Sequence, residues 1–273
     1  MRVALLGCGA IGSSVAEALA RGEVPGAVLC AVFDQVAERA ERVSRLFAPE
    51  VPVARSIEEL LGSGAELVVE AASQQAVQQY GERILRAGCD LLVLSVGALL
   101  EPPGQELPAE AVRLGRRLYI PSGGIAGIDG VRAAAFRGEI ETVVLTTRKP
   151  PHALSPETLV QHLQLKPEQI QQPTQVYEGS AREAVRHFPA NINIAATLSL
   201  AGIGPERTLV RIIADPTLSV NVHEIYVRGT FGELTLVVRN IPHPENPRTS
   251  LLAVLSVLEM LRWICSPGIH LGT

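Results

Sequence analysis

Short apolar runs alternate with amphipathic segments over the first part of the chain. The apolar runs predict buried strands, whereas segments with apolar residues three and four positions apart predict helices. Strands that alternate with helices roughly every 20–30 residues indicate βαβ units and a parallel sheet. The predicted strands are 2–6, 27–33, 66–72, 90–99 and 118–123, and the predicted helices are 13–22, 35–47, 56–62, 73–88 and 108–117. In the third helix, Ser56 is the expected N-cap, with Glu59 three residues later.

The pattern changes after Gly124, where strands and helices no longer alternate. We expect a polar, glutamine-rich surface helix and loop over 161–177, and two helices over 181–202 that are broken at Pro189. Three strands joined by short turns predict an antiparallel meander. The remaining predicted elements are a helix at 125–138, a strand at 141–151, and the three meander strands at 207–216, 219–229 and 232–241.

The last predicted helix, 249–264, is apolar nearly all round, which indicates burial. We expect it to return to the first domain and to cover its sheet. A role in a dimer interface is the alternative that the pattern leaves open.

Composition limits the function classes. The chain has 273 residues, of which 47% are hydrophobic and 19% charged, so it can bury a large core and is not disordered. A net charge of −4 and 4% aromatic residues argue against nucleic acid as a partner. The longest uncharged stretch, 188–205, contains two prolines and two asparagines, so we expect no membrane span.

Four cysteines are spread along the chain without a CxxC pair. The chain begins directly with a strand-like run, and we expect no signal peptide and a cytoplasmic protein with reduced thiols. No two Cys or His residues have the spacing of metal ligands, so we expect no metal site. The cysteines are Cys8, Cys30, Cys89 and Cys265.

A GxGxxG motif follows the first strand and opens the first helix, which is the context of a dinucleotide-binding loop. We expect Gly7 to permit the turn, Gly9 to admit a pyrophosphate, and Gly12 to allow close packing of helix and strand. Asp34 follows Gly12 by 22 residues and ends the second strand, where a carboxylate binds ribose hydroxyls and favours NAD over NADP. The alternative is a glycine-rich turn without cofactor, in which the aspartate caps the next helix. Ala10 and Ile11 complete the motif, and Arg39 or Arg42 could still assist a 2′-phosphate.

The motif and the element order together predict an α/β fold. A Rossmann-type parallel-sheet domain comprises 1–123 and 249–273, and an inserted α+β domain for substrate binding and dimerisation comprises 124–248. Ligands of such sheets lie outside the carboxyl ends of the strands. The small residues expected there to contact the cofactor are Ala72, Ser73, Ser95, Gly97, Ala98 and Gly124, with Gly123 expected at the substrate.

Polar residues of the second domain are candidates for the chemistry. Strand alternation places Asn221 and His223 on one face, with an apolar face behind, and a histidine there can transfer protons near neutral pH. A half-exposed strand histidine is the alternative. Asn191 and Asn193 flank Ile192 at the start of an apolar helix. Asn191 could be an N-cap, whereas a second asparagine so close suggests a carboxamide placed on a ligand, with a structural role for Asn193 as the alternative.

Arg148 and Lys149 end a strand and could bind a substrate carboxylate, although solvated strand ends are common. The other histidines lie in loops, before a proline or near the terminus, and we expect all of them at the surface. They are His152, His162, His187, His243 and His270.

Several stretches together resemble the L-aspartate dehydrogenase family, over nearly the whole chain. They are RVALLGCGAIG at the start, LSVGALL at 94–100, IPSGGIAGIDG at 120–130, TTRKPP at 146–151, FPANINIAATLSLAG at 188–202, DPTLSVNVHEI at 215–225 and ENPRTS at 245–250. Members of that family oxidise L-aspartate with NAD or NADP, through iminoaspartate, to oxaloacetate and ammonia. Iminoaspartate can feed NAD biosynthesis, and members are commonly homodimers.

The resemblance implies that His223 is the catalytic residue. It also implies that an asparagine contacts the nicotinamide or the substrate, and Asn193 matches the family position best by its spacing to His223. The SGGIAG loop, which includes Ala126, matches a nicotinamide-contact loop, although family versions often carry alanine where this chain has Gly124. The implied substrate has two carboxylates, for which the expected donors are Arg148, Lys149, Asn191, Asn221 and the amides of Gly123 and Gly124.

Other functions share the same features. A related two-domain reductase, acting on dihydrodipicolinate or homoserine, has the glycine loop and an inserted α+β domain. A non-catalytic dinucleotide sensor would bind NADH without turnover and usually carries a DNA-binding module, but no basic recognition helix is visible. An inactive paralogue is the third alternative.

Overall fold

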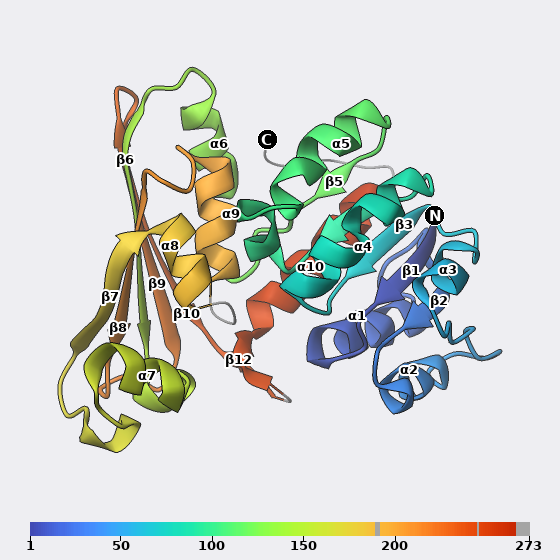
Figure 1. Ribbon diagram of the computed structural model, residues 1–273, viewed down its shortest axis with the longest axis horizontal. Coiled ribbons are helices and arrows are strands. Elements are labelled where there is room, and N and C mark those ends of the chain that lie inside the picture. Colours follow the sequence, from blue (N-terminus) through green and yellow to red (C-terminus); the bar gives the residue numbers. More distant parts are fainter. Residues whose placement is uncertain (189–191, 245, 266–273) are drawn as a thin grey trace. The chain divides into compact units, whose positions relative to one another are not determined.

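The computed structural model describes residues 1–188, 192–244 and 246–265 of the chain (Figure 1). These residues form two compact units. Unit 1 comprises Met1–Pro121 and the described residues from Val254 onward, and unit 2 comprises Ser122–Ala253.

Unit 1 contains a five-stranded sheet in the order β2-β1-β3-β4-β5, in which every pair is parallel. The strands are β1 (Arg2–Leu6), β2 (Val28–Phe33), β3 (Leu67–Glu70), β4 (Asp90–Val93) and β5 (Leu118–Tyr119). The helices are α1 (Ala10–Ala20), α2 (Ala37–Ser44), α3 (Ile57–Leu61), α4 (Gln74–Arg86) and α5 (Leu107–Arg113), with 3₁₀ turns η1 (Val96–Leu100) and η2 (Gly104–Glu106). The predicted Rossmann-type order of strands and helices is confirmed.

Local signals in unit 1 act as expected, with one exception. Ser56 caps α3 by accepting a hydrogen bond from the amide of Glu59 at 3.3 Å, as predicted. The predicted strand 90–99 was too long, because β4 ends at Val93 and the chain then turns into η1. The reason is a side chain: the Glu70 carboxylate accepts the amides of Leu94 and Ser95, which draws the backbone out of the sheet.

The terminal helix α10 (Leu251–Cys265) contributes to the core of unit 1. Val257 and Leu261 are fully buried in the same apolar cluster as Val3, Leu5 and Val69, so the expected return of this helix is confirmed. Burial on both faces explains the apolar runs 3–6, 67–69 and 91–93 within β1, β3 and β4.

Unit 2 contains a five-stranded mixed sheet in the order β10-β9-β6-β8-β7. The strands are β6 (Ile140–Lys149), β7 (Thr174–Ser180), β8 (Thr208–Ala214), β9 (Asn221–Gly229) and β10 (Gly232–Asn240), with a short ribbon of β11 (Pro242–His243) and β12 (Asn246–Ser250). The helices are α6 (Ile128–Ala135), α7 (Pro156–Leu163), α8 (Ala181–His187) and α9 (Asn193–Ala201), with 3₁₀ turns η3 (Pro151–Ala153) and η4 (Pro167–Gln169).

Two predictions for unit 2 were wrong. The three late strands do not form a meander, because β6 lies between β8 and β9, parallel to the first and antiparallel to the second. At ten residues β6 is long, and alternate side chains along it, such as Val143 and Leu145, are buried, which suits a central strand. The segment 161–177 was expected to be surface helix and loop, but its end enters β7, where Val176 is buried.

The two helices predicted over 181–202 are confirmed as α8 and α9, and Pro189 lies outside the described residues. Both helices contact β8, and Figure 1 shows α6, α8 and α9 on one side of the sheet. The side chains of β6 and β9 that point to this side include Leu145, Ile225 and Val227, which are buried. We refer to this side as the inner face of the unit 2 sheet.

Candidate functional site

The glycines of the loop after β1 have different roles. Gly7 has φ +98, and a Cβ there would lie 2.6 Å from the carbonyl of Ala71. A Cβ on Gly12 would lie 2.0 Å from the carbonyl oxygen of Gly7, so neither position accepts a side chain without a shift of backbone. A Cβ on Gly9 would meet nothing within 4 Å. Two glycines therefore hold the loop against β3 and α1, and the third leaves an open surface.

That open surface lies at the start of α1. Gly9 is the N-cap and offers no side-chain hydrogen bond to the first amides, and the first turn contains no acidic residue. The first turn begins with Ala10 and Ile11, both half-buried. A helix start with backbone donors and no capping side chain attracts an anion, which suits the phosphates of a dinucleotide.

Asp34 connects this loop to the end of β2. One carboxylate oxygen accepts the amide of Cys8 at 2.7 Å, and the other accepts the amide of Val36 at 2.8 Å. The side chain is half-buried, and each oxygen keeps a lone pair for a ribose hydroxyl. Arg39 and Arg42 are exposed on α2.

Cys8 is an inert member of the loop. Burial and the nearby Asp34 carboxylate raise the pKa of the Cys8 thiol to about 12, against an opposing effect of Arg42. The thiol is therefore protonated at physiological pH and is no nucleophile.

The residues after β3 and β4 lie at the carboxyl edge of the unit 1 sheet, where they were predicted. The hydroxyl of Ser73 caps α4 by accepting the amide of Ala76 at 3.1 Å, and the hydroxyl of Ser95 donates to Glu70 at 2.8 Å. Gly97 is buried, and a Cβ there would lie 2.4 Å from the Gln74 amide nitrogen. Ala98 is fully buried and offers no side-chain surface, whereas Ala72 is exposed.

Sequence reasoning missed Glu70 in unit 1. This carboxylate is fully buried at the end of β3 and accepts four hydrogen bonds. A charge at the end of the run LVVE was the available signal, since a buried carboxylate needs partners.

In unit 2, β6 and β9 bring three residues together on the inner face. His223 and Lys149 were predicted site residues, and Thr147 was not. Thr147 and His223 are register partners, and their Oγ1 and Nδ1 atoms lie 3.0 Å apart. Lys149 lies two residues further along β6 and is buried, with 4% of its surface exposed. Thr147 was not predicted, because the register that pairs it with the histidine is not visible in the sequence.

The electrostatics of this group follow from burial. His223 is 3% exposed, and desolvation, helped by the Lys149 ammonium, lowers its pKa to about 3. Desolvation also lowers the pKa of Lys149 to about 8. At neutral pH the histidine is therefore an uncharged base. The ammonium of Lys149 beside it loses its proton at a lower pH than an exposed lysine does.

A second part of the inner face involves the loop at the start of unit 2. Asn221 and Asn240 are buried register partners on β9 and β10, and the Asn240 amide donates to the carbonyl of Gly124 at 2.7 Å. A Cβ on Gly124 would lie 2.8 Å from the Ser250 hydroxyl and 3.2 Å from Ile194. The loop is thus packed between β10 and the first turn of α9.

The rest of that loop is more open. Gly123 has φ +67 with no atom within 4 Å of a Cβ, and Ala126 is exposed. Asn193 is the first residue of α9 and is half-exposed. Asn191 lies outside the described residues.

Arg148 is not on the face that carries His223. It points to the opposite face and forms ion pairs with Glu224 at 3.2 Å and Asp215 at 3.9 Å. The prediction that the face of β9 opposite His223 is apolar was also wrong. Val222 lies on that face, but Glu224 and Tyr226 follow it there. Lys149 is the basic side chain that β6 places beside the histidine.

The expectation that all other histidines are at the surface was wrong in two cases. His243 is buried, and His162 is half-buried against Phe188, with ring centroids 4.9 Å apart. The Nε2 atom of His162 has no hydrogen-bond partner among the described residues. His152 and His187 are exposed, and His270 lies outside the described residues.

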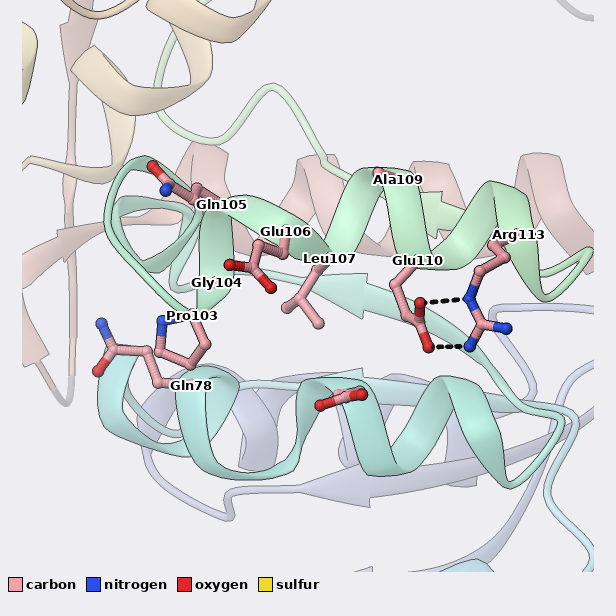
Figure 2. A pocket seen from close by; sticks show the side chains of 10 residues that line it. Gln78, Pro103, Gly104, Gln105, Glu106, Leu107, Ala109, Glu110 and Arg113 are labelled. Atoms are coloured by element: carbon pink, nitrogen blue, oxygen red, sulfur yellow. Dashed lines mark hydrogen bonds and ion pairs between the residues drawn. The ribbon is translucent and has the colours of Figure 1, made fainter.

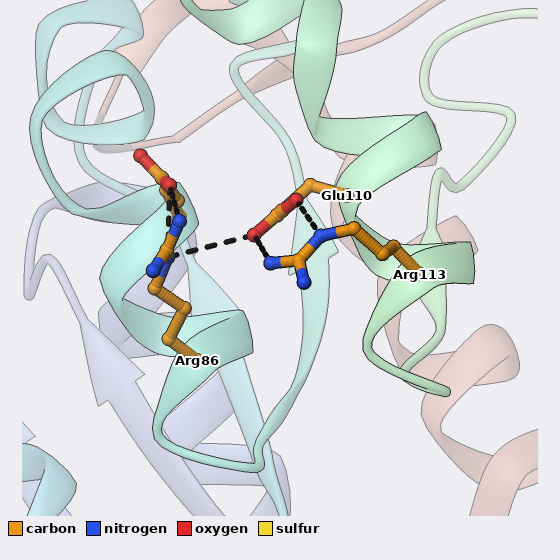
Figure 3. Close-up of polar contacts among 4 residues, drawn as sticks. Arg86, Glu110 and Arg113 are labelled. Atoms are coloured by element: carbon orange, nitrogen blue, oxygen red, sulfur yellow. Dashed lines mark hydrogen bonds and ion pairs between the residues drawn. The ribbon is translucent and has the colours of Figure 1, made fainter.

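A groove between α4 and α5 is separate from these sites. Figure 2 shows its lining, which includes Gln78, Glu106 and Leu107 and none of the predicted site residues. Figure 3 shows the Glu110 carboxylate between Arg113 and Arg86. It accepts hydrogen bonds from Nη2 and Nε of Arg113 at 2.5 and 2.7 Å, and it lies 3.5 Å from Nε of Arg86. These hydrogen bonds and charges lower the pKa of Glu110. The groove is an ion-paired surface between two helices.

In the described part of the chain, no group of three or more His, Cys, Asp or Glu residues could hold a metal ion. None of its helices is both long and apolar enough to cross a membrane.

Two family models match the chain. One is described as aspartate dehydrogenase, C-terminal, and covers residues 129–264. The other is described as homoserine dehydrogenase, NAD binding domain, and covers residues 7–121.

Whole-chain relatives point the same way. The chain is 46% identical over 277 residues to the L-aspartate dehydrogenase of Methanosarcina barkeri, with 100% of both chains covered. It is 38% identical over 273 residues to the L-aspartate dehydrogenase of Nitrosopumilus maritimus, with 100% of this chain and 99% of the relative covered.

Among solved structures, the aspartate dehydrogenase of Thermotoga maritima is similar, with 27% identity, a TM-score of 0.77 and 99% of each chain covered. A homoserine dehydrogenase from Thiobacillus denitrificans, at 13% identity and a TM-score of 0.61 over 97% of this chain and 74% of the other, shares the fold alone.

Proposed function

The chain belongs to the aspartate dehydrogenase family, and from that membership we propose that it catalyses the NAD(P)-dependent oxidative deamination of L-aspartate. The reaction takes aspartate, water and NAD(P)⁺ to oxaloacetate, ammonium, NAD(P)H and a proton, with iminoaspartate between. The observation that carries the proposal is His223, a buried uncharged histidine beside Lys149, in the unit that matches the family's C-terminal model.

The residues of unit 1 fit a dinucleotide. The start of α1 offers backbone amides without a capping side chain, a Cβ-free surface at Gly9 lies beside it, and Asp34 provides acceptors for ribose hydroxyls. When bound, the nicotinamide supplies the acceptor for the hydride that leaves Cα of aspartate. A carboxylate at Asp34 favours NAD, because it repels the 2′-phosphate of NADP. Arg42, exposed on the neighbouring helix, is the residue that would moderate this preference.

His223 is the general acid–base of the proposal. Its Nδ1 is engaged by the Thr147 hydroxyl, which leaves Nε2 for the reaction. Because the ring is uncharged at neutral pH, it can accept a proton from the water that adds to iminoaspartate. The same proton can then be returned to the amine, so that the C–N bond breaks with loss of ammonia, and the ammonia takes the hydroxyl proton as the ketone of oxaloacetate forms.

Lys149 is the proposed partner of a substrate carboxylate. A buried ammonium is a strong partner for an anion, and desolvation lowers the pKa of Lys149 to about 8. A carboxylate that arrives beside it would raise the pKa of Lys149 again and hold the charge in place. Asn221 and the amide of Gly123 are the further donors that we assign to substrate, and Asn193 and the Gly124 loop to the nicotinamide.

We also infer a homodimer that works in the cytoplasm. The side of the unit 2 sheet opposite the inner face carries half-exposed apolar residues such as Val144 and Ile213 among ion pairs, for example Arg211 with Glu178 at 2.7 Å. A sheet face of mixed apolar and paired charged residues suits contact with a second copy. Light scattering coupled to gel filtration tests this directly, and a monomer mass at micromolar concentration would reject it.

The activity is tested by following NADH absorbance with purified protein, L-aspartate and NAD at alkaline pH, where the substrate amine loses its proton. NADP, D-aspartate, L-glutamate and homoserine run in parallel. NADH formation with L-aspartate alone among the substrates supports the proposal. NADH binding without turnover of aspartate, together with turnover of homoserine, would assign the chain to the related reductases instead.

A further inference from the structure

Glu70 stands out in unit 1 because it is a fully buried carboxylate outside the catalytic group. Glu70 is the last residue of β3. Its hydrogen-bond partners are three backbone amides and one hydroxyl, and none of these groups carries a positive charge. Burial of a carboxylate is costly unless each oxygen is hydrogen-bonded. We propose that Glu70 is a positioning residue for the dinucleotide: it fixes the turns after β3 and β4, which line the edge of the sheet where the dinucleotide binds.

The hydrogen bonds join two strand ends. Oε1 accepts the amide of Ala72 at 2.9 Å and the hydroxyl of Ser95 at 2.8 Å. Oε2 accepts the amides of Ser95 at 2.9 Å and Leu94 at 3.2 Å. Ala72 follows β3, and the other two follow β4, so a single side chain fixes both turns at the carboxyl edge of the sheet.

This edge is where a parallel sheet of this kind binds its ligand. The bond to Ala72 also controls the glycine loop, because a Cβ on Gly7 would lie 2.6 Å from the carbonyl of Ala71 and 2.7 Å from Cα of Ala72. The backbone that Glu70 holds is therefore the surface against which the loop packs. A shift of this segment would move both the loop and the turn into η1.

The proposal rests on the proposed function only in that unit 1 binds a dinucleotide. Glutamine cannot replace the carboxylate, because its NH₂ group can donate but not accept. With NH₂ at the position of Oε2, the backbone amides of Leu94 and Ser95 face another donor and lose their acceptor. With NH₂ at the position of Oε1, the Ser95 hydroxyl can rotate to accept, but the amide of Ala72 still faces a donor.

The test compares Glu70→Gln with Asp90→Asn. Asp90 is a half-buried carboxylate at the opposite end of the neighbouring strand, where it accepts the amide of Arg117 at 3.0 Å. NADH binding is measured by fluorescence titration, thermal unfolding gives Tm, and hydrogen exchange reports the amides of Ala72, Leu94 and Ser95. We expect both variants to lower Tm, but only Glu70→Gln to raise the Kd for NADH, by about tenfold, since displaced binding groups lose affinity steeply. Faster exchange at the three amides should accompany it, with the KM for L-aspartate at saturating NAD unchanged.

Each outcome separates the alternatives. An NADH Kd in Glu70→Gln equal to that of the wild type, with Tm lowered as in Asp90→Asn, would overturn the positioning role. Absence of NADH binding by the wild type would instead reject the proposed function. If Glu70→Gln does not fold, Glu70→Asp takes its place: it keeps the charge but is one methylene too short to reach both turns, and an unchanged Kd in this variant also overturns the proposal.

Discussion

The two units contain sites that are built in different ways. In unit 1 the loop after β1 depends on backbone: two glycines that admit no Cβ, a helix start without a capping side chain, and carboxylates at Asp34 and Glu70 that bind amides. In unit 2 the group around His223 depends on side chains from different strands, and Thr147 and His223 are 76 residues apart in the sequence.

The difference determines what each site tolerates. A site made of backbone is sensitive to added atoms, since any side chain at Gly7 or Gly12 displaces main chain. A site made of buried side chains is sensitive to removed atoms, because a lost partner leaves a polar group unsatisfied. Binding or activity should therefore be lost when atoms are added in unit 1 and when atoms are removed in unit 2, and the following variants test this.

The largest effect is expected for His223→Ala. Removal of the proposed general acid–base should lower kcat by about 1,000-fold, the order found for positioned proton-transfer groups. Since NADH binds through unit 1, its Kd should be unchanged. Steady-state rates and fluorescence titration check both values, with His152→Ala, an exposed histidine in η3, as the control. A kcat for His223→Ala close to that of the control would remove His223 from the mechanism.

The next effect is expected for Gly12→Ala. The added Cβ would lie 2.0 Å from the Gly7 carbonyl oxygen, so the loop must move, and we expect a lower Tm and an NADH Kd raised about 100-fold. Gly9→Ala is the matched variant, because its Cβ meets nothing within 4 Å. It should keep the Tm of the wild type and still weaken NADH binding, because the added methyl group occupies the surface where the phosphates approach. Equal NADH affinity of Gly9→Ala and wild type would show that no ligand approaches Gly9.

Much of unit 1 could be predicted from the sequence, because its signals are local. The spacing of Gly7, Gly9 and Gly12, the acid at Asp34 and the cap at Ser56 each act over a few residues or at a strand end. Glu70 was missed, because three of its four hydrogen bonds come from residues that follow another strand, and the charge that ends LVVE does not show which residues those are.

Less of unit 2 could be predicted, because its site depends on register. His223 was predicted as a candidate from its strand, but its pairing with Thr147 requires β6 to lie beside β9, and the sequence order suggested a meander without β6. For the same reason Arg148 and Lys149 could not be told apart. Strand alternation places them on opposite faces, but which face carries His223 depends on the partner strand.

Lys149 allows a single variant to test both the pH dependence of stability and the binding of substrate. Its pKa is about 8 in the folded chain against a usual 10.5, so between these values the unfolded chain binds more protons, and the free energy of unfolding rises with pH. Lys149→Met should abolish this rise, because the methionine side chain does not titrate. The same variant should raise the KM for L-aspartate about tenfold, the order of one charge-assisted hydrogen bond.

Lys166→Met is the control for this variant, since Lys166 is exposed and is the second of the two lysines in the chain. It should change neither the pH dependence of Tm between 8 and 10.5 nor the KM. If the rise persists in Lys149→Met, another group titrates over this range, and a normal KM would exclude Lys149 from substrate binding.

The smallest effect is expected for Thr147→Val, which keeps the shape of the side chain and removes the hydroxyl that lies 3.0 Å from Nδ1 of His223. The ring then loses the contact that sets its tautomer and its orientation, and one hydrogen bond of about 1 kcal/mol corresponds to a kcat lowered roughly fivefold. KM should not change, because the hydroxyl is engaged by the histidine. Thr146→Val is the matched control, since Thr146 is the preceding residue of β6 and points to the opposite side of the sheet. If the two variants have the same kcat, packing alone orients His223, and the side-chain network of unit 2 contributes less to catalysis than its burial suggests.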